Sequence, residues 1–270
     1  GFFRTYMPQD KVKSWINRQR FGLSHLSASL FGALTPFCSC SSIPIFLGFM
    51  EAGIPLGVGF SFLITSPLVN EYLVVLMLGF FGWKITLAYV ASGVLIGTLS
   101  GLLLGRMDLE KELVRDLVSN GFKEKKYKIF KERMRFGWNE ATDIVKKLWL
   151  WIMVGVGLGA LIHNLVPAES INKVIEAGGI FAIPLAVIVG VPIYANCAAI
   201  LPIAVVLFQK GVPLGTALSF MMATSALSLP EAVILRRAMK IKLIIIFFAI
   251  VTAGIILTGY LFNFLQGTLV

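Results

Sequence analysis

Three cysteines carry the most reactive side chains of this sequence, and two of them stand one residue apart. Cys38 and Cys40 flank Ser39 in a short Ser-rich segment that is bounded by prolines, and Cys197 follows Asn196 in a second segment that prolines also bound. Thiolates are soft ligands that favour thiophilic ions, and they also form transient disulfides with thiol substrates. The closely spaced pair predicts capture of a thiophilic substrate; the alternative is free cysteine packed as a small buried residue.

The three thiols are not accompanied by the side chains that a permanent metal centre needs. A structural zinc site has four ligands at characteristic spacings, and beside the thiols the sequence offers only His25 and His163. We therefore expect no cofactor and no resident metal, only a transient metalloid at Cys38, Cys40 and Cys197. The sequence contains no nucleotide-binding loop either, so we expect a protein that is not an enzyme and does not hydrolyse ATP.

The neighbourhoods of these cysteines belong to a repeat. Gly53–Gly57 reads GIPLG, and Gly211–Gly215, 158 positions later, reads GVPLG. The same offset places Cys197 at the position of Ser39. A pair of interrupted hydrophobic segments at corresponding places in two halves is the best sequence pointer to a transport site in a membrane protein. The duplication therefore predicts a transporter made of a first and a second copy of one unit.

The composition indicates a membrane protein. Hydrophobic residues make up 57% of the 270 residues and charged residues 14%, whereas a soluble domain carries about 25% charged residues. The net charge of +10 fits the excess of Lys and Arg in the cytoplasmic loops of membrane proteins, so we do not expect nucleic acid as a partner. Five segments approach the roughly 20 apolar residues of a membrane span: Leu56–Leu78, Ile85–Leu104, Leu148–Val166, Leu214–Leu235 and Leu243–Leu265.

Each copy also contains two apolar stretches that are too short to span. We expect them to form the arms of a broken, re-entrant hairpin, because a span needs roughly 20 residues. Linkers separate the arms, Thr35–Ser42 in the first copy and Pro192–Ala199 in the second. Unwound backbone survives at membrane depth only where protein or a water-filled cavity satisfies it, so these linkers predict a binding site. The expected arms are Phe21–Leu34, Ile43–Met50, Ile180–Val191 and Leu201–Phe208.

The fold class that we expect is an all-α integral membrane protein with two inverted-topology repeats. We divide the chain into a first copy at 1–105, a charged cytoplasmic loop at 106–147 and a second copy at 148–270. With that loop inside, all but three of the Lys and Arg side chains fall on the cytoplasmic side, as the positive-inside rule requires. An inverted arrangement brings the two linkers together near the membrane midplane.

The repeat also carries an expectation about the upstream side of the chain. Met7–Lys11 resembles Val166–Ser170, which follows the predicted span Leu148–Val166 of the second copy. Only Gly1–Tyr6 precedes the corresponding point of the first copy. We therefore expect a further transmembrane helix upstream of residue 1 in the natural protein.

A second interruption in each copy brings further polar candidates. Hydroxyl groups there are expected to line a cavity or, alternatively, to satisfy the backbone beside a helix break. Glu71 is either a proton-coupling carboxylate or a helix-end residue near the outer interface. Glu231 is expected to form an ion pair with Arg236 at the cytoplasmic end. The candidates for cavity lining or coupling are Thr65, Ser66, Asn70, Glu71, Thr224 and Ser225.

Three blocks of the sequence resemble a known family. Thr35–Pro44 (TPFCSCSSIP), Ser66–Glu71 (SPLVNE) and Val191–Asn196 (VPIYAN) are similar to the signature of the ArsP-like (YraQ-like) bacterial permeases. The resemblance covers almost the whole chain apart from the loop at 106–147. It implies a multi-pass permease of the bacterial inner (plasma) membrane. Some members of that family export trivalent organoarsenicals such as methylarsenite, and other members need not share that substrate.

We therefore expect a permease that exports a thiophilic substrate, such as a trivalent (organo)arsenical, through a midplane site. Two alternatives stay open: a transporter of a sulfur-containing anion such as thiosulfate, and a membrane thiol–disulfide oxidoreductase that uses Cys38 and Cys40. The expected partners are the substrate and the lipid bilayer, and homo-oligomerisation stays open as well. The expected substrate-binding residues are Cys38, Cys40, Cys197, Ser39, Ser41, Asn196 and Tyr194.

Overall fold

In the residues that the computed structural model describes, the chain folds into helices joined by short turns. An isolated antiparallel bridge between Leu113 and Met239 is the one extended pairing among these residues. The described residues are 22–35, 39–51, 53–107, 109–113, 142, 153, 179–193, 197–209 and 211–269.

Two helices of each copy have bounds that match across the repeat. The first copy contains α2 (Leu23–Leu34), α3 (Ser39–Glu51), α4 (Leu56–Leu68) and α5 (Glu71–Arg106), which the short 3-10 helix η2 (Leu109–Glu112) follows. The second copy contains η3 (Gly179–Phe181), α9 (Ala182–Gly190), α10 (Cys197–Gln209), α11 (Leu214–Ala226), α12 (Leu229–Ala238) and α13 (Ile241–Leu269). Helices α3 and α10, and likewise α4 and α11, are 158 positions apart at both ends. The offset of the sequence repeat is therefore also the offset of the helix bounds.

Three stretches of helix are long and apolar enough to cross a membrane, so the predicted all-α membrane class is confirmed for the described residues. They are Glu71–Arg106, Leu214–Arg236 and Ile241–Thr268. Three of the five predicted spans lie inside these stretches. The predicted span Leu56–Leu78 is interrupted between α4 and α5, and Leu148–Val166 lies outside the described residues.

The second arm of each predicted hairpin is longer than expected. Helix α3 begins at Ser39 and α10 at Cys197, each four residues before the predicted start. Ser39–Ser42 and Cys197–Ala199 therefore lie in helices and not in the linkers to which we assigned them. The N–H groups in the first turn of a helix have no intrahelical partners, so small polar residues, which favour this position, mark a helix start here.

Helix α5 changes direction at Gly82, whose φ of +77° and ψ of 176° interrupt the helical backbone. Glycine alone adopts such a conformation without strain. The part of α5 beyond Gly82 returns antiparallel to α4: the start of α4 at Gly57 lies against Gly101, and its end at Thr65 lies against Gly97. The part before Gly82 extends beyond the end of α4, so α4 and this part together form one discontinuous helix.

The returning helices pack backbone against backbone in both copies. A Cβ placed on Gly57 would lie 2.5 Å from the carbonyl oxygen of Gly101. In the second copy a Cβ on Gly215 would collide with the carbonyl oxygen of Gly259, which stands at the corresponding position. Small residues at such contacts let membrane helices approach closely. The repeat thus preserves the helix–helix contact as well as the helix bounds.

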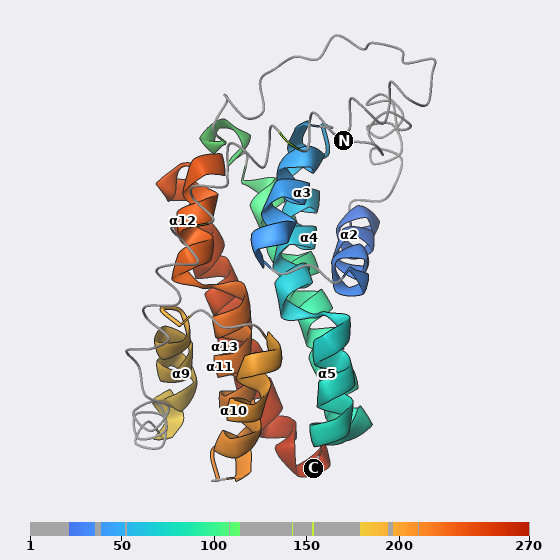
Figure 1. Cartoon of the computed structure of the whole chain (residues 1–270), viewed down its shortest axis with the longest axis vertical. Coiled ribbons are helices and arrows are strands. Elements are labelled where there is room, and N and C mark those ends of the chain that lie inside the picture. Colours follow the sequence, from blue (N-terminus) through green and yellow to red (C-terminus); the bar gives the residue numbers. More distant parts are fainter. Residues whose placement is uncertain are drawn as a thin grey trace.

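Helices α4 and α11 form the centre of the molecule. All 13 residues of each are buried, whereas α5 and α13 expose large apolar side chains such as Trp83 and Leu257. In Figure 1, α2 and α3 lie in the upper half of the view around α4, and α9 and α10 lie in the lower half around α11. The exposed apolar faces are those that a bilayer would cover.

Candidate functional site

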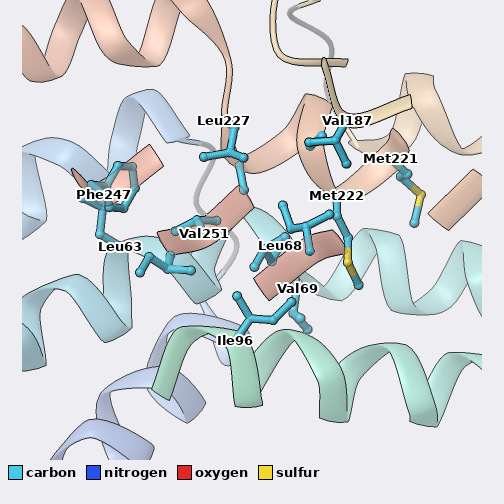
Figure 2. Packing of buried hydrophobic residues seen from close by; sticks show 14 of the residues in the cluster. Leu63, Leu68, Val69, Ile96, Val187, Met221, Met222, Leu227, Phe247 and Val251 are labelled. Carbon is cyan, nitrogen blue, oxygen red and sulfur yellow. The ribbon is translucent and has the colours of Figure 1, made fainter. Parts of the chain in front are cut away.

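Each of the buried helices α4 and α11 is followed by an interruption of the helical backbone. We call Val69–Asn70, between α4 and α5, the first-copy break, and Leu227–Ser228, between α11 and α12, the second-copy break. Leu68, Val69 and Leu227 belong to one cluster of buried hydrophobic residues (Figure 2). Helices α4 and α11 are also in contact. Both breaks therefore border the same core.

At the first-copy break, side chains complete the hydrogen bonds that the helix leaves open. Asn70 is the N-cap of α5, and its Oδ1 accepts a hydrogen bond from the Leu73 backbone N–H at 2.8 Å. The hydroxyl of Tyr89 donates to the carbonyl oxygen of Leu68 at 3.0 Å. Tyr89 is fully buried, so this bond forms away from water, where an unpaired carbonyl is costly.

At the second-copy break, the chain is tied to the neighbouring hairpin. The N–H of Leu229 donates to the carbonyl oxygen of Val191, which directly follows α9, at 3.1 Å. Ser228 is the N-cap of α12, and its Oγ accepts a hydrogen bond from the N–H of Glu231 at 3.3 Å. A movement of the hairpin that begins with α9 would therefore act on the start of α12.

Glu231 is the functional candidate that sequence reasoning missed. It is 1% exposed, and neither of its carboxyl oxygens has a hydrogen-bond partner among the described residues. It is also the one Asp, Glu, Lys or Arg side chain that is buried among those that the structure describes. The predicted ion pair with Arg236 is wrong: Arg236 is exposed, and residues five apart point about 140° away from each other around a helix.

The four predicted hydroxyl residues are all buried in α4 and α11. Thr65 donates to the carbonyl oxygen of Ser61 at 2.8 Å, Thr224 to that of Phe220 at 2.7 Å, and Ser225 to that of Met221 at 2.8 Å. These bonds satisfy the backbone four residues back in the same helix. Ser66 is buried beside them. Their role in lining a cavity stays a prediction.

The predicted thiol site is described only in part. Cys38, Tyr194 and Asn196 lie outside the described residues. Ser39, Cys40 and Ser41 occupy the first turn of α3, and Cys197 is the first residue of α10; their side chains also lie outside the described part. The convergence of the three thiols therefore stays a prediction.

Glu71 was expected to be either a coupling carboxylate or a helix-end residue. It lies in the first turn of α5, directly after the N-cap Asn70, and is exposed on the surface of the chain. A carboxylate in the first turn is stabilised by the positive end of the helix dipole. This placement favours the helix-end alternative, and it contrasts with the burial of Glu231.

Buried helices that are interrupted, such as α4 and α11, are typical of membrane transporters. The family profile ArsP_1, described as "Predicted permease", matches residues 1–264, so the chain belongs to this permease family. The resemblance noted from the sequence blocks is thereby confirmed.

Individual relatives are distant. The chain is 21% identical over 176 residues to a "Putative two-component membrane permease complex subunit" of Streptococcus mutans, covering 64% of this chain and 58% of that protein. It is 24% identical over 117 residues to UPF0718 protein YcgR of Bacillus subtilis, covering 43% of this chain and 40% of that protein. It is 23% identical over 259 residues to UPF0718 protein YraQ of Escherichia coli, covering 96% and 73%. No solved structure matches the chain.

Proposed function

We propose that the chain is a multi-pass permease of a bacterial inner membrane, built from two inverted-topology repeats with a substrate site between their hairpin tips. The observation that carries the proposal is the matched pair of fully buried helices, α4 and α11, each interrupted at its end before α5 or α12 begins. The placement of α2–α3 and α9–α10 in opposite halves of the view in Figure 1 supports the inversion. Transport sites in such folds lie where broken helices meet.

We place the loop at 106–147 in the cytoplasm. Its first residues lie at the same end of the molecule as the turn between α12 and α13, because Leu113 pairs with Met239 and Lys240 Nζ lies 3.3 Å from Glu112 Oε2. Basic residues therefore gather at this end, in agreement with the positive-inside rule. The turn at Gly82 lies at the opposite end of the returning part of α5. We assign that end to the outer side.

The proposed substrate is thiophilic, such as a trivalent organoarsenical, and is exported. Helices α3 and α10 both begin after the linker of a predicted hairpin, with Cys40 in the first turn of α3 and Cys197 at the start of α10. Two thiols match the two exchangeable positions on the arsenic of methylarsenite, and a third thiol would pass it on by ligand exchange. Serine keeps the size of cysteine but not its affinity for soft ions.

A sulfur-containing anion such as thiosulfate is the second candidate. Helices α5 and α12 begin at the two breaks, and α3 and α10 begin after the linkers of the predicted hairpins. Helix N-termini carry partial positive charge and favour anions. Binding of such an anion would require the partial positive charge at the helix N-termini, but no trivalent atom in the substrate.

Uptake into everted membrane vesicles tests both candidates. We expect methylarsenite to accumulate with the wild-type chain and not with Cys38→Ser or Cys40→Ser. Ser27→Ala is the control, because its hydroxyl lies on α2 and bonds to the carbonyl oxygen of Ser24, away from the tip. Full uptake in both cysteine variants would overturn the thiol site, and wild-type uptake of thiosulfate alone would favour the anion.

A further inference from the structure

Glu231 lies inside a membrane-spanning stretch without any of the usual means of stabilising a charge. The stretch Leu214–Arg236 is apolar and largely buried, and Glu231 is 1% exposed within it. Both carboxyl oxygens lack a hydrogen-bond partner among the described residues. An ionised carboxylate in such surroundings is costly, and ionisable residues inside membrane proteins usually mark an ion or proton pathway.

A purely structural role for Glu231 would be to complete the cap of α12. Ser228 and Glu231 have the spacing of a capping box, in which the glutamate carboxylate accepts a bond from the N–H of the N-cap residue. Only one half of the box is present: the Glu231 N–H donates to Ser228 Oγ, but the carboxyl oxygens are unpaired in the described residues. The carboxyl group is therefore not used to hold the helix start in place.

The neighbouring helices bring no described charge to Glu231. Helix α12 packs against α3 and α13, and the described α3 side chains, Ser42–Met50, include no titratable group. On α13, Lys242 and Tyr260 are exposed, as is Arg236 on α12 itself. A metal ion would need several ligands, and no three His, Cys, Asp or Glu side chains come together in the described part of the chain. A single carboxyl without further ligands suits a proton.

We infer that Glu231 is the proton-binding carboxyl that couples this permease to the proton gradient. In the cycle, one carboxylate oxygen takes up H⁺ from water on one side of the membrane, and an O–H bond forms as the charge of the group goes from −1 to 0. The neutral group is then buried between α3 and α13, and H⁺ returns to water when the site opens to the other side. This inference rests on the proposed transport function.

The position of Glu231 links this proton to the substrate site. Helix α3, against which α12 packs, carries Cys40 in its first turn, and the start of α12 is bonded to Val191 of the other hairpin. A change in the packing of either hairpin would therefore change the access of water to Glu231. The corresponding residue of the first copy is Leu73, which is fully buried and cannot titrate. The described chain thus offers one such proton site and not two.

The proton itself can be measured without any substrate. We would record infrared difference spectra of the purified full chain in lipid vesicles between neutral and alkaline pH. The wild-type chain should lose a carboxylic-acid C=O band on the alkaline side, and Glu231→Gln should lack that band. Glu71→Gln is the matched control, since its carboxyl is exposed, and it should keep the band. The same band in Glu231→Gln as in the wild type would overturn the inference.

Transport in the same vesicles tests the coupling. With methylarsenite as probe, Glu231→Gln should lose the accumulation driven by an imposed pH gradient but keep methylarsenite exchange without a gradient. Accumulation unchanged in Glu231→Gln, or wild-type accumulation driven by a Na⁺ gradient alone, would overturn the proton role. Loss of exchange as well, in a variant that stays folded by size-exclusion chromatography, would also overturn it. A wild-type chain that does not exchange methylarsenite would contradict the proposed substrate, and the infrared result would still decide the proton site.

Discussion

The two breaks occupy equivalent places in the repeat, yet they differ in their chemistry. At the first-copy break, Tyr89 donates to the carbonyl oxygen of Leu68, whereas Phe247 occupies the position equivalent to Tyr89 and has no hydroxyl. At the second-copy break, Glu231 is buried and unpaired among the described residues, whereas Leu73 occupies its position in the first copy. At the first-copy break a tyrosine hydroxyl is bonded to the carbonyl oxygen at the end of the helix. The second-copy break instead contains a buried carboxyl group without a hydrogen-bond partner among the described residues.

The difference shows which features of a duplicated membrane unit are fixed and which are free to change. The contacts of Gly57 and Gly215 are made by backbone atoms, so almost any side chain would block them. The polar groups at the breaks act through side chains, and a substitution in one copy leaves the other unaffected. We therefore expect backbone contacts to be equivalent in the two copies and the functional chemistry to be asymmetric.

The largest expected effect concerns the glycine contacts that are equivalent in the two copies. Gly215→Val should destabilise the protein by about 3 kcal/mol or more, the upper end of the usual overpacking range, because its side chain would meet the backbone of Gly259. Gly57→Val should have a similar effect at Gly101 in the first copy. The measurement is the thermal midpoint of the detergent-solubilised protein, followed by fluorescence-detected size exclusion.

Gly79→Ala and Gly267→Ala are the controls for these variants. A Cβ at either position would meet nothing within 4 Å, and alanine is a better helix former than glycine. Both control substitutions should leave the thermal midpoint unchanged or raise it slightly. A clear loss of stability in only one copy would break the equivalence of the two helix pairs.

The sequence predicted where the helices are interrupted better than it predicted how the side chains at the breaks are paired. Gly53 and Gly211 both have positive φ, and such conformations are nearly restricted to glycine, so the repeated motif marks the same turn twice. The start of α3 was misplaced because Ser39–Ser42 is not apolar, although these residues suit the first turn of a helix. Residue type locates turns well, but hydropathy alone does not locate the first turn of a helix.

The isolation of Glu231 could not be derived from sequence spacing. The Ser228–Glu231 pattern is a capping box in sequence, which would have predicted a paired carboxylate, and the proximity of Arg236 suggested an ion pair. Which groups surround a side chain depends on the packing of α3 and α13 against α12. Helix α3 is far from α12 in sequence, so only the fold shows that no described partner is present.

A smaller effect is expected at the bond that completes the first-copy break. Tyr89→Phe should destabilise the protein by about 1–3 kcal/mol, because it leaves the buried carbonyl oxygen of Leu68 without this donor while the ring still fills its place. Tyr72→Phe is the control, since Tyr72 is 65% exposed, and it should leave the thermal midpoint unchanged. If Tyr89→Phe were as stable as the wild type, the first-copy break would be no better satisfied than the second.

The two N-caps allow a direct comparison between the copies. Asn70→Ala and Ser228→Ala should each destabilise the protein by about 1 kcal/mol. Asn70→Ala should have the larger effect, because the bond to Leu73 N is 2.8 Å long and that from Glu231 N to Ser228 is 3.3 Å. Chemical unfolding in mixed micelles would measure the order. The reverse order would mean that Ser228 supports more than the helix start, for example the position of Glu231.

The smallest effect is expected where the two copies are joined outside the membrane core. Lys240→Ala removes the ion pair with Glu112, in which the lysine side chain is 56% exposed and the glutamate side chain 22% exposed. Exposed ion pairs contribute only about 0.2–1 kcal/mol to stability. The backbone bond from Lys240 N to the Glu112 carbonyl oxygen, at 2.9 Å, would remain, so the junction should stay intact. Lys240→Pro removes that N–H as well and should cost more stability. Equal and small effects of both variants would show that the junction between η2 and α13 adds little to the contacts that α3, α4 and α5 make with the second copy.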